Sequence, residues 1–333
     1  MDSRQLLVLA INRLPGTKGW KKHRLLLECR DMSDFQESAK QYLSGLRMAR
    51  RTETVNVQRI ISEAEVEIGC LEHWGIQYSV LGNSDYPPAL AMISDPPFVL
   101  YRRGLVDFNG KPPIAIVGTR RPSGDGLREA YKLGLEFALA AYPVVSGLAF
   151  GIDKAAHEGA LDGGGRTWAV LAGGLDRPSP FSHRSLATRI LDKGGALLGE
   201  IPPGGFPLKY AFPRRNRILS GLCRGCITVQ APRKSGALTT AEFALEQDRD
   251  LYVGSSGITG PYSEGTRNLE EQGAPVVRSA GDVLADWGRF TDVRRVEAVG
   301  APCSGADMAG LMRKELNGCL YRHYGGWFES RGA

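Results

Sequence analysis

Between residues 114 and 277, short apolar runs alternate with segments in which apolar residues recur at helical spacing. Continuous apolar runs predict strands buried on both faces, and their alternation with helices predicts a parallel sheet covered by helices. The predicted strands are residues 114–117, 144–146, 168–172, 196–199, 227–229, 251–253 and 275–277. The predicted helices are residues 124–140, 152–162, 182–193, 214–222, 238–248 and 265–272. The expected fold class is therefore α/β, with a doubly wound, mostly parallel sheet.

The two ends of the chain lack this alternation. The N-terminal residues carry apolar clusters at helical spacing, interrupted at Leu14-Pro15-Gly16, and predict a small helical domain without strands. The proline-rich stretch 86–97 predicts an extended lead-in with no regular element. The C-terminal residues predict one amphipathic helix, at 308–316, and are too few for a well-formed independent domain. The expected units are a helical domain at 1–80, the α/β domain at 81–289 and a short C-terminal appendage at 290–333.

Composition limits the class of protein. The 333 residues include 42 Lys plus Arg and 36 Asp plus Glu, so net charge alone is weak support for nucleic-acid binding. No apolar run approaches the roughly 20 residues that cross a bilayer, and the N-terminus lacks the pattern of a signal peptide. We therefore expect a cytoplasmic protein that does not contact a membrane.

The cysteines carry no clear chemical signal. Six of them are scattered through the chain, which is typical of a reducing compartment. Only Cys223 and Cys226 form a CxxC pair, and a structural zinc site would need a second pair of ligands with similar spacing, which is not found nearby. We interpret both residues as small side chains where a helix enters a strand, and we expect no metal site.

The segments that directly follow the predicted strands share one chemistry. In open α/β sheets, ligands bind beyond the carboxyl ends of the strands. Glycines let a backbone approach a ligand closely, helix N-termini offer free N–H groups to anions, and basic side chains add charge. These segments are residues 118–121, 147–153, 173–176, 200–217 and 235–236. Together they predict a ligand that carries phosphate, although each glycine-rich loop alone is equally explained as a structural turn.

The first of these loops argues against a redox cofactor. The dinucleotide-binding pattern G-x-G-x-x-G would be expected directly after the first strand of a Rossmann-type unit. The residues found there are Val117-Gly118-Thr119-Arg120. We therefore expect no cofactor.

Charge is unevenly distributed in the second half of the chain. Between Glu200 and Glu242 the sequence contains no acidic residue. The basic residues in this interval are Lys209, Arg214, Arg215, Arg217, Arg224, Arg233 and Lys234. A solvated basic helix face stays an alternative, although such a face normally carries acids at i,i+4 spacing. Because Phe206, Tyr210 and Phe212 lie among the charges, the interval favours single-stranded nucleic acid, whose backbone meets basic groups and whose bases stack on aromatic rings.

A hydrolytic site is a weaker alternative. Ser146, Asp153 and His157 cluster at one strand-to-helix junction, and the last two share a helix face because they are four residues apart. However, the sequence has no G-x-S-x-G nucleophile elbow there. Asp153 is also well placed to stabilise its helix N-terminus by charge alone. We therefore interpret these residues as structural.

Seven ordered motifs between about residues 85 and 280 resemble the DNA-processing protein A family (DprA/Smf). The motif segments are residues 86–87 with 95–97, 117–120 with 126, 146–149, 151–153 with 157, 200–204, 212–222 and 235–241. The resemblance implies an extended Rossmann-like domain that binds single-stranded DNA, forms a homodimer and has no enzymatic activity. It further implies that the protein protects incoming or processed DNA and helps load the RecA recombinase in natural transformation or recombination. In family terms, the N-terminal helices resemble a sterile-alpha-motif domain.

The same resemblance assigns DNA contacts by position. The side chains that would hold phosphates or stack on a base are Arg120, Lys209, Phe212, Arg214, Arg215 and Arg217. The residues that would line the pocket through backbone contacts are Ser146, Gly147, Ser235 and Gly236. No catalytic residue is implied.

Some segments depart from the family's pattern. Gly254-Ser255-Ser256-Gly257 stands where members commonly read P-G-S. Residues 290–333 are shorter than the winged-helix domain with which many members end, so this appendage resembles a degenerate remnant of that domain.

The main alternative is the related lysine-decarboxylase-like (LOG) group, which cleaves nucleoside monophosphates with a P-G-G-x-G-T-x-x-E motif. Here Phe243 falls where the catalytic glutamate belongs, and Glu242 would point about 100° away around a helix. A protein-interaction scaffold is a third alternative.

Overall fold

The computed structural model describes residues 2–45, 56–260 and 262–289, together with three strands between residues 295 and 331. Its centre is a nine-stranded sheet with the strand order β1-β2-β6-β5-β4-β3-β7-β8-β9. The parallel strands are β3 (Ile114–Val117), β4 (Val144–Ser146), β5 (Thr167–Val170), β6 (Ala196–Gly199), β7 (Gly225–Thr228), β8 (Asp250–Gly254) and β9 (Val276–Val277). At one edge, β2 (Val99–Gly104) and β1 (Gln77–Val80) continue the sheet in antiparallel pairing.

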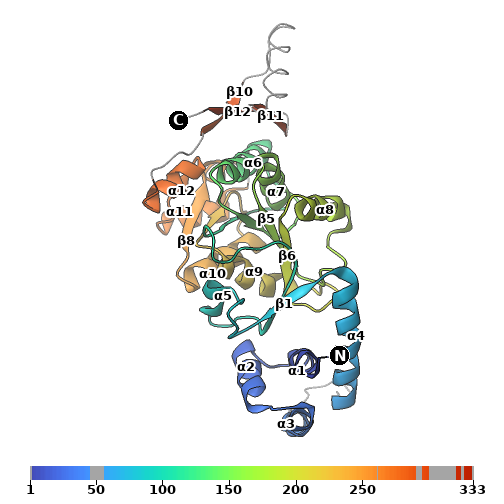
Figure 1. The fold of residues 1–333 in the computed structure, drawn as a ribbon. Coiled ribbons are helices and arrows are strands. Elements are labelled where there is room, and N and C mark those ends of the chain that lie inside the picture. The colour runs from blue at the N-terminus through green and yellow to red at the C-terminus, as the bar shows by residue number, and fades with distance from the viewer. Residues whose placement is uncertain are drawn as a thin grey trace.

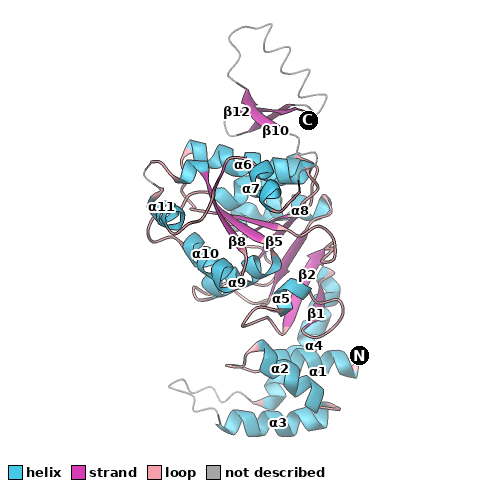
Figure 2. Cartoon of the chain, turned by 90° about the vertical axis from the view of Figure 1, so that its left-hand side faces the viewer, coloured by secondary structure: helices cyan, strands magenta, loops and turns pink. Residues whose placement is uncertain are grey.

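Helices cover both faces of this sheet (Figure 2). The helices α6 (Gly124–Leu139) and α7 (Ile152–Asp162) pack on one face, and α9 (Ala211–Leu222) and α10 (Gly236–Glu246) pack on the other. Strand β3 shows the division, because Ile116 belongs to the core under α6 and α7, whereas Val117 belongs to the core under α9 and α10. Burial on both faces explains why the strands are continuous apolar runs.

The predicted doubly wound α/β fold is confirmed, with element ends shifted by up to three residues. Shorter helical segments complete the domain, namely η1 (Phe181–His183), α8 (Arg184–Asp192), η2 (Ser255–Gly257), α11 (Glu264–Glu271) and α12 (Ala280–Asp286). The largest shift is at α9, which begins at Ala211 rather than at residue 214. Because of this shift, Phe212 and Pro213 belong to the helix.

Two predictions about the region before residue 100 are wrong. The segment 1–80 was expected to lack strands, but β1 pairs with β2 through four residues, a long-range contact that a local pattern does not reveal. The stretch 86–97 was expected to have no regular element, but it contains the one-turn helix α5 (Pro88–Ala91). Pro88 occupies the first position of α5, where the missing N–H group has no intrahelical partner to lose.

In residues 2–45 and 56–76, four helices agree with the predicted helical character of the N-terminal region, which lies at the bottom of Figure 1. They are α1 (Ser3–Asn12), α2 (Gly19–Glu28), α3 (Met32–Gly45) and α4 (Val57–Trp74). Six consecutive residues of α1, from Leu6 to Ile11, are buried, so this helix is apolar on all sides and is surrounded by its neighbours. Helix α4 leads directly into β1 and so connects the helical region to the sheet.

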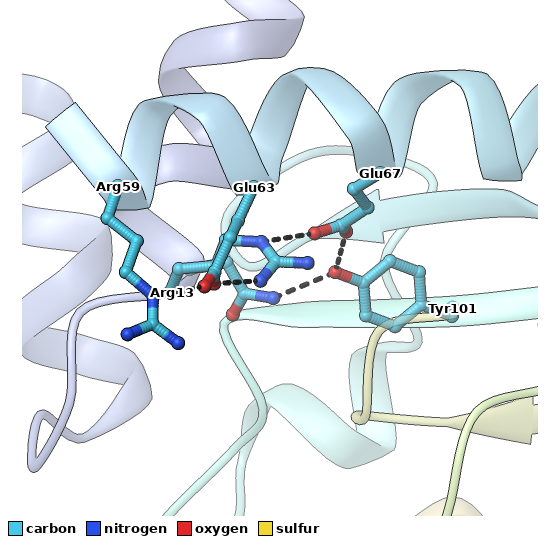
Figure 3. A network of polar contacts seen from close by, with 6 residues as sticks. Arg13, Arg59, Glu63, Glu67 and Tyr101 are labelled. Carbon is cyan, nitrogen blue, oxygen red and sulfur yellow. Dashed lines mark hydrogen bonds and ion pairs between the residues drawn. The ribbon is translucent and has the colours of Figure 1, made fainter. Parts of the chain in front are cut away.

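A buried polar network also joins the helical region to strand β2 (Figure 3). The Glu67 carboxylate on α4 accepts hydrogen bonds from Arg13 Nε, at 2.8 Å, and from the Tyr101 hydroxyl on β2. Asn12 Nδ2 donates a hydrogen bond to the same hydroxyl at 2.9 Å. Glu67 is 1% exposed, and burial raises its pKa, whereas the hydrogen bond from Tyr101 and the Arg13 charge act in the opposite direction. These contacts fix α1 and α4 against the edge of the sheet.

The C-terminal strands form a separate antiparallel sheet with the order β10-β12-β11. These strands are β10 (Arg295–Val299), β11 (Leu320–His323) and β12 (Gly326–Arg331). The sequence predicted one helix in this appendage and did not predict these strands. The predicted helix itself, at 308–316, lies outside the described residues.

Candidate functional site

A cavity of about 600 Å³ lies at the carboxyl ends of strands β3 and β7. These neighbouring strands mark the point where the sheet reverses its winding, because the chain continues from β3 to β4 on one side and from β7 to β8 on the other. Such a switch point is where open α/β sheets bind their ligands. The cavity is lined by residues 117–121 at the end of β3, by residues 232, 234–237 and 239–240 after β7, and by side chains of α9. Ala149, Asp153 and Tyr262 complete its wall.

Hydrogen bonds hold the two loops together. The Thr119 N–H donates to the Gln230 carbonyl oxygen at 2.7 Å, so the loop after β3 is fixed against the chain that leaves β7. Ser235 caps α10, since its hydroxyl oxygen accepts from the Ala237 N–H at 3.3 Å. Gly236 is exposed, and a Cβ atom there would meet no atom of the described residues within 4 Å. The N-terminus of α10 is therefore open to the cavity, with its partial positive charge and free N–H groups available to an anion.

Four basic side chains line the cavity, against one acidic side chain. The cations are Arg120, Arg121, Arg215 and Lys234, and the acid is Asp153. The Arg120 guanidinium lies over the Phe212 ring, 5.6 Å from its centroid, so the exposed charge and the ring form one unit on the cavity wall. This combination of cations and one aromatic face suits a phosphate and a base.

Arg215 is the buried member of this set, at 7% exposure. Its Nη1 donates a hydrogen bond to the Val170 carbonyl oxygen at 3.0 Å, at the end of β5. Burial lowers the pKa of the Arg215 guanidinium, while the charge of Asp153 raises it. Burial also raises the pKa of the Asp153 carboxyl, whereas Arg215 and hydrogen bonds from the Gly147 and Ala149 N–H groups act against that shift. The two charges thus stabilise each other at the floor of the cavity.

The structure brings together five of the ten residues assigned by sequence. Arg120, Phe212, Arg215, Ser235 and Gly236 all line the cavity. Gly147 is not part of the cavity wall, but its lack of a side chain allows Arg215 to pack against its backbone. Ser146 is fully buried, and its hydroxyl donates to the Ile116 carbonyl oxygen at 2.7 Å, so this side chain has a structural role.

The other three assigned residues lie outside the cavity lining. Lys209 is exposed on the loop before α9. Arg214 and Arg217 turn away from the cavity toward Glu200, with ion pairs of 3.4 Å to Oε1 and 2.6 Å to Oε2 respectively. The basic segment 209–217 is therefore divided by the helical period of α9 between two surfaces.

Further lining residues were not assigned from the sequence. Arg121 and Lys234 add exposed charges on the two loops, and Tyr262 contributes a second ring from the segment before α11. Asn216 donates a hydrogen bond from Nδ2 to the Gly236 carbonyl oxygen at 3.1 Å, which links α9 to the start of α10. Arg121 and Lys234 each follow a predicted strand, so their position after a strand was the signal available in the sequence.

The three residues of the hydrolytic alternative are not joined by hydrogen bonds into a Ser-His-Asp chain, although Ser146 and Asp153 interact. Besides the Ser146 contact, His157 Nδ1 lies 2.7 Å from Thr167 Oγ1, which itself donates to the Val144 carbonyl oxygen at 2.8 Å. His157 is fully buried, and burial, reinforced by the charges of His183 and Arg215, lowers its pKa to about 3. Asp153 is bound by backbone N–H groups instead of by the histidine. Their interpretation as structural residues therefore agrees with the contacts.

The turn after β8 contains Gly254-Ser255-Ser256-Gly257, where the sequence departs from the family's P-G-S pattern. The Glu129 carboxylate on α6 accepts hydrogen bonds from the backbone N–H groups of Ser255 and Ser256, at 2.7 and 2.9 Å, and from both hydroxyls. This carboxylate therefore fixes the turn from inside the domain. The lysine-decarboxylase-like alternative finds no support in α10, because Glu242 is exposed and is not part of the cavity wall.

Within 2–45, 56–260 and 262–289, no cluster of three or more His, Cys, Asp or Glu side chains is placed to ligate a metal ion. In the same described part of the chain, every helix is too short or too polar to cross a membrane.

Comparison with known proteins places this fold in a family. Residues 77–288 match the family described as DNA recombination-mediator protein A. DNA processing protein DprA of Streptococcus pneumoniae is 42% identical over 212 residues, which cover 63% of this chain and 73% of that protein. Protein Smf of Escherichia coli is 41% identical over 199 residues, 60% of this chain and 53% of that protein.

Solved structures agree with the sequence comparison. The X-ray structure of DNA processing protein A from S. pneumoniae matches with a TM-score of 0.67 and 30% identity, covering 86% of this chain and 98% of that chain. DNA processing protein A from Helicobacter pylori, studied for its single-stranded DNA binding mode, matches with a TM-score of 0.57 and 30% identity, covering 64% of this chain and 96% of that chain. The shared sequence, sheet and motifs show that the chain belongs to the DNA recombination-mediator protein A family.

Proposed function

We propose that this protein binds single-stranded DNA, without sequence preference, in the cavity at the switch point of its sheet. The observation that carries the proposal is the convergence of Arg120, Arg121, Arg215 and Lys234 beside the Phe212 ring. Basic groups that follow a backbone, with an aromatic face for a base, are the common features of proteins that bind single strands. The relative from H. pylori, whose structure addresses single-stranded DNA binding, supports the same ligand class.

The geometry suggests a role for each group. The open N-terminus of α10 and the exposed side chains of Arg120, Arg121 and Lys234 would contact phosphates. Arg215, held beneath them, would add a fixed positive charge at the cavity floor. The Phe212 ring would stack on one base, with the Arg120 guanidinium packed against the same ring.

The loop before α9 extends this surface. Phe206 and Tyr210 are 71% and 67% exposed, which is unusual for large aromatic side chains, and exposed Lys209 lies between them in sequence. The loop is anchored, since the Gly204 N–H donates to Asp176 Oδ1 at 2.9 Å. A strand leaving the cavity over the start of α9 would therefore meet further rings and a charge.

Binding affinity measured by fluorescence anisotropy tests this site. The double variant Arg121→Ala, Lys234→Ala is expected to lower affinity for a labelled single strand by at least about tenfold, because two phosphate contacts are removed. Arg224→Ala is the matched control: Arg224 comes from the same acid-free interval, but it pairs with Asp250 at 3.6 Å and packs over Trp287 away from the cavity. Equal losses in both proteins would refute the cavity as the binding site.

The cellular role belongs to the same proposal. The description of the family as recombination mediators supports a role in DNA recombination. Within that role, we propose that the protein protects incoming or processed DNA and helps load RecA, as a cytoplasmic homodimer without enzymatic activity. On strands already covered by single-strand-binding protein, this chain is expected to shorten the lag before RecA filaments form. An unchanged lag would contradict the loading role, and light scattering that gives a monomer mass would contradict the dimer.

A further inference from the structure

A second, smaller cavity of about 160 Å³ lies between the N-terminal helices and the α/β domain. The helical region contributes Asn12, Thr17, Gly19 and Lys22 to its wall. The α/β domain contributes residues 96–99 and 200–202, and the side chains of Arg214 and Arg217. This cavity is separate from the site proposed for DNA, and α9 forms part of the wall of both.

Arg217 is the buried cation of this cavity, at 4% exposure. Its Nη2 contacts Glu200 Oε2 at 2.6 Å and its Nε lies 3.3 Å from Asp95 Oδ2. Among the residues that the structure describes, however, neither Nε nor Nη1 has a hydrogen-bond partner. An unsatisfied donor on a buried charged group costs free energy, so a partner for Nη1 is expected.

The local charge balance indicates which kind of partner fits. Lys22, Arg214 and Arg217 provide three positive charges, and Glu200 and Asp95 provide two negative charges. Burial and the nearby Arg214 charge lower the pKa of Lys22 to about 8, although both carboxylates raise it. An additional negative charge would compensate the excess, whereas a water molecule alone would not.

The start of α2 also favours an anion in this cavity. This ten-residue helix begins at Gly19 on the cavity wall and has neither a side-chain cap nor an acidic residue in its first turn. A Cβ atom on Gly19 would lie 1.9 Å from the Pro96 carbonyl oxygen, so glycine is required for the helix to approach the α/β domain this closely. The positive end of the helix dipole and the buried guanidinium therefore face one small space.

We propose that this interdomain cavity binds one phosphate group, held by Lys22, Arg214, Arg217 and the N-terminus of α2. The cavity is too small for a nucleotide but accommodates a single tetrahedral oxyanion. The group comes either from free inorganic phosphate or from the 5′-phosphate at the end of a DNA strand. A bound phosphate joins the helical region to the α/β domain, and this inference does not depend on the proposed function.

Thermal unfolding of the full chain in inorganic phosphate, with sodium chloride adjusted to constant ionic strength, tests the proposal. At about ten times the Kd for phosphate, the Tm is expected to rise by roughly 2 °C. Lys22→Met should abolish this rise, and Arg214→Met, at a half-exposed side chain, should reduce it. Lys21→Met is the matched control, because Lys21 is an exposed neighbour on the same helix and should retain the full rise.

Two comparisons separate the possible outcomes. Arg120→Ala, which alters the larger cavity, should leave the phosphate-dependent rise unchanged, so failure of the DNA site and failure of this site are distinguishable. Tighter binding of a 5′-phosphorylated than of a 5′-hydroxyl single strand, lost in Lys22→Met, identifies the DNA end as the source. Equal binding of both strands, with the rise in Tm retained, identifies free phosphate. No rise in the wild-type protein, or the same rise in Lys22→Met, overturns the proposal.

Discussion

The Arg215 guanidinium occupies the space beside the Gly147 Cα atom: a Cβ atom on Gly147 would lie 1.7 Å from Arg215 Nη1. That nitrogen also donates to the Val170 carbonyl oxygen. Arg215 thus reaches the floor of the larger cavity only because residue 147 has no side chain.

Gly147→Ala is therefore expected to displace Arg215 and to lower affinity for single-stranded DNA by about tenfold, equivalent to roughly 1.4 kcal/mol. Anisotropy titration measures this loss. Gly69→Ala is the matched control, because a Cβ atom at this position in α4 meets no atom within 4 Å in the described part of the chain. Its affinity should equal that of the wild-type protein. Unchanged affinity in Gly147→Ala would show that Arg215 is not a DNA contact.

Phe212 and Arg120 form one contact but should act on binding differently. Phe212→Ala is expected to cost about 1–3 kcal/mol of binding free energy with little change in salt dependence, because stacking releases no counterions. Arg120→Ala should reduce the magnitude of the slope of log K against log salt by about 0.7, the value for one contact to a single strand. Titrations at several salt concentrations separate the two effects. If the slope of log K against log salt changed in Phe212→Ala but not in Arg120→Ala, these assignments would be contradicted.

His157 should make stability depend on pH. Burial lowers its folded-state pKa from 6.5 to about 3, so the unfolded chain binds a proton first as pH falls. The neutral, folded form is favoured above pH 6.5, and about 2 kcal/mol of that stability should be lost by pH 5.

Urea unfolding of His157→Asn and wild-type protein at several pH values measures this contribution. Asparagine can still donate to Thr167 but does not titrate, so the decline in stability between pH 6.5 and 5 should be shallower in the variant. His73→Asn, at an exposed position of α4, should keep the wild-type decline. Parallel curves for His157→Asn and wild type would refute the shifted pKa.

The network of Arg13, Glu67 and Tyr101 should contribute to stability. Arg13→Met leaves the Glu67 carboxylate buried without a cation and is expected to lower the free energy of unfolding by roughly 2–4 kcal/mol. Arg24→Met removes an exposed i,i+4 ion pair with Glu28, and its cost should be much smaller because solvent screens exposed pairs. Chemical denaturation compares the two variants. Similar small costs in both would show that the buried pair stabilises no more than a surface pair.

Local sequence patterns predict most of the sheet because its parallel strands are buried on both faces. Runs such as Ile114–Val117 have an apolar residue at every position, and their short length, flanking Gly or Pro and β-branched residues favour strands over helices. Strands β1 and β2 were missed because each has a mixed pattern at the edge of the sheet, where pairing depends on residues about 25 positions apart, such as Gln77 and Arg102. Strand order likewise depends on long-range contacts, so the position of the switch point could not be predicted.

The site could be predicted only in part for a similar reason. The acid-free interval identifies a basic region, but it does not show which cations share a surface. Arg214 and Arg217 turn toward Glu200 while Arg215 turns into the larger cavity, because successive residues of a helix point about 100° apart. Moreover, the predicted start of the helix was three residues late, which left Phe212 in a loop.

The most direct test of the proposed function is the salt dependence of binding to matched single- and double-stranded oligonucleotides. If the four cations of the larger cavity contact phosphates, log K for the single strand should fall against log salt with a slope of about −3, at 0.7 per contact. The single strand should also bind more tightly than the duplex at every salt concentration, because Phe212 requires an unpaired base for stacking. A flat titration, or equal affinity for both forms, would contradict the account.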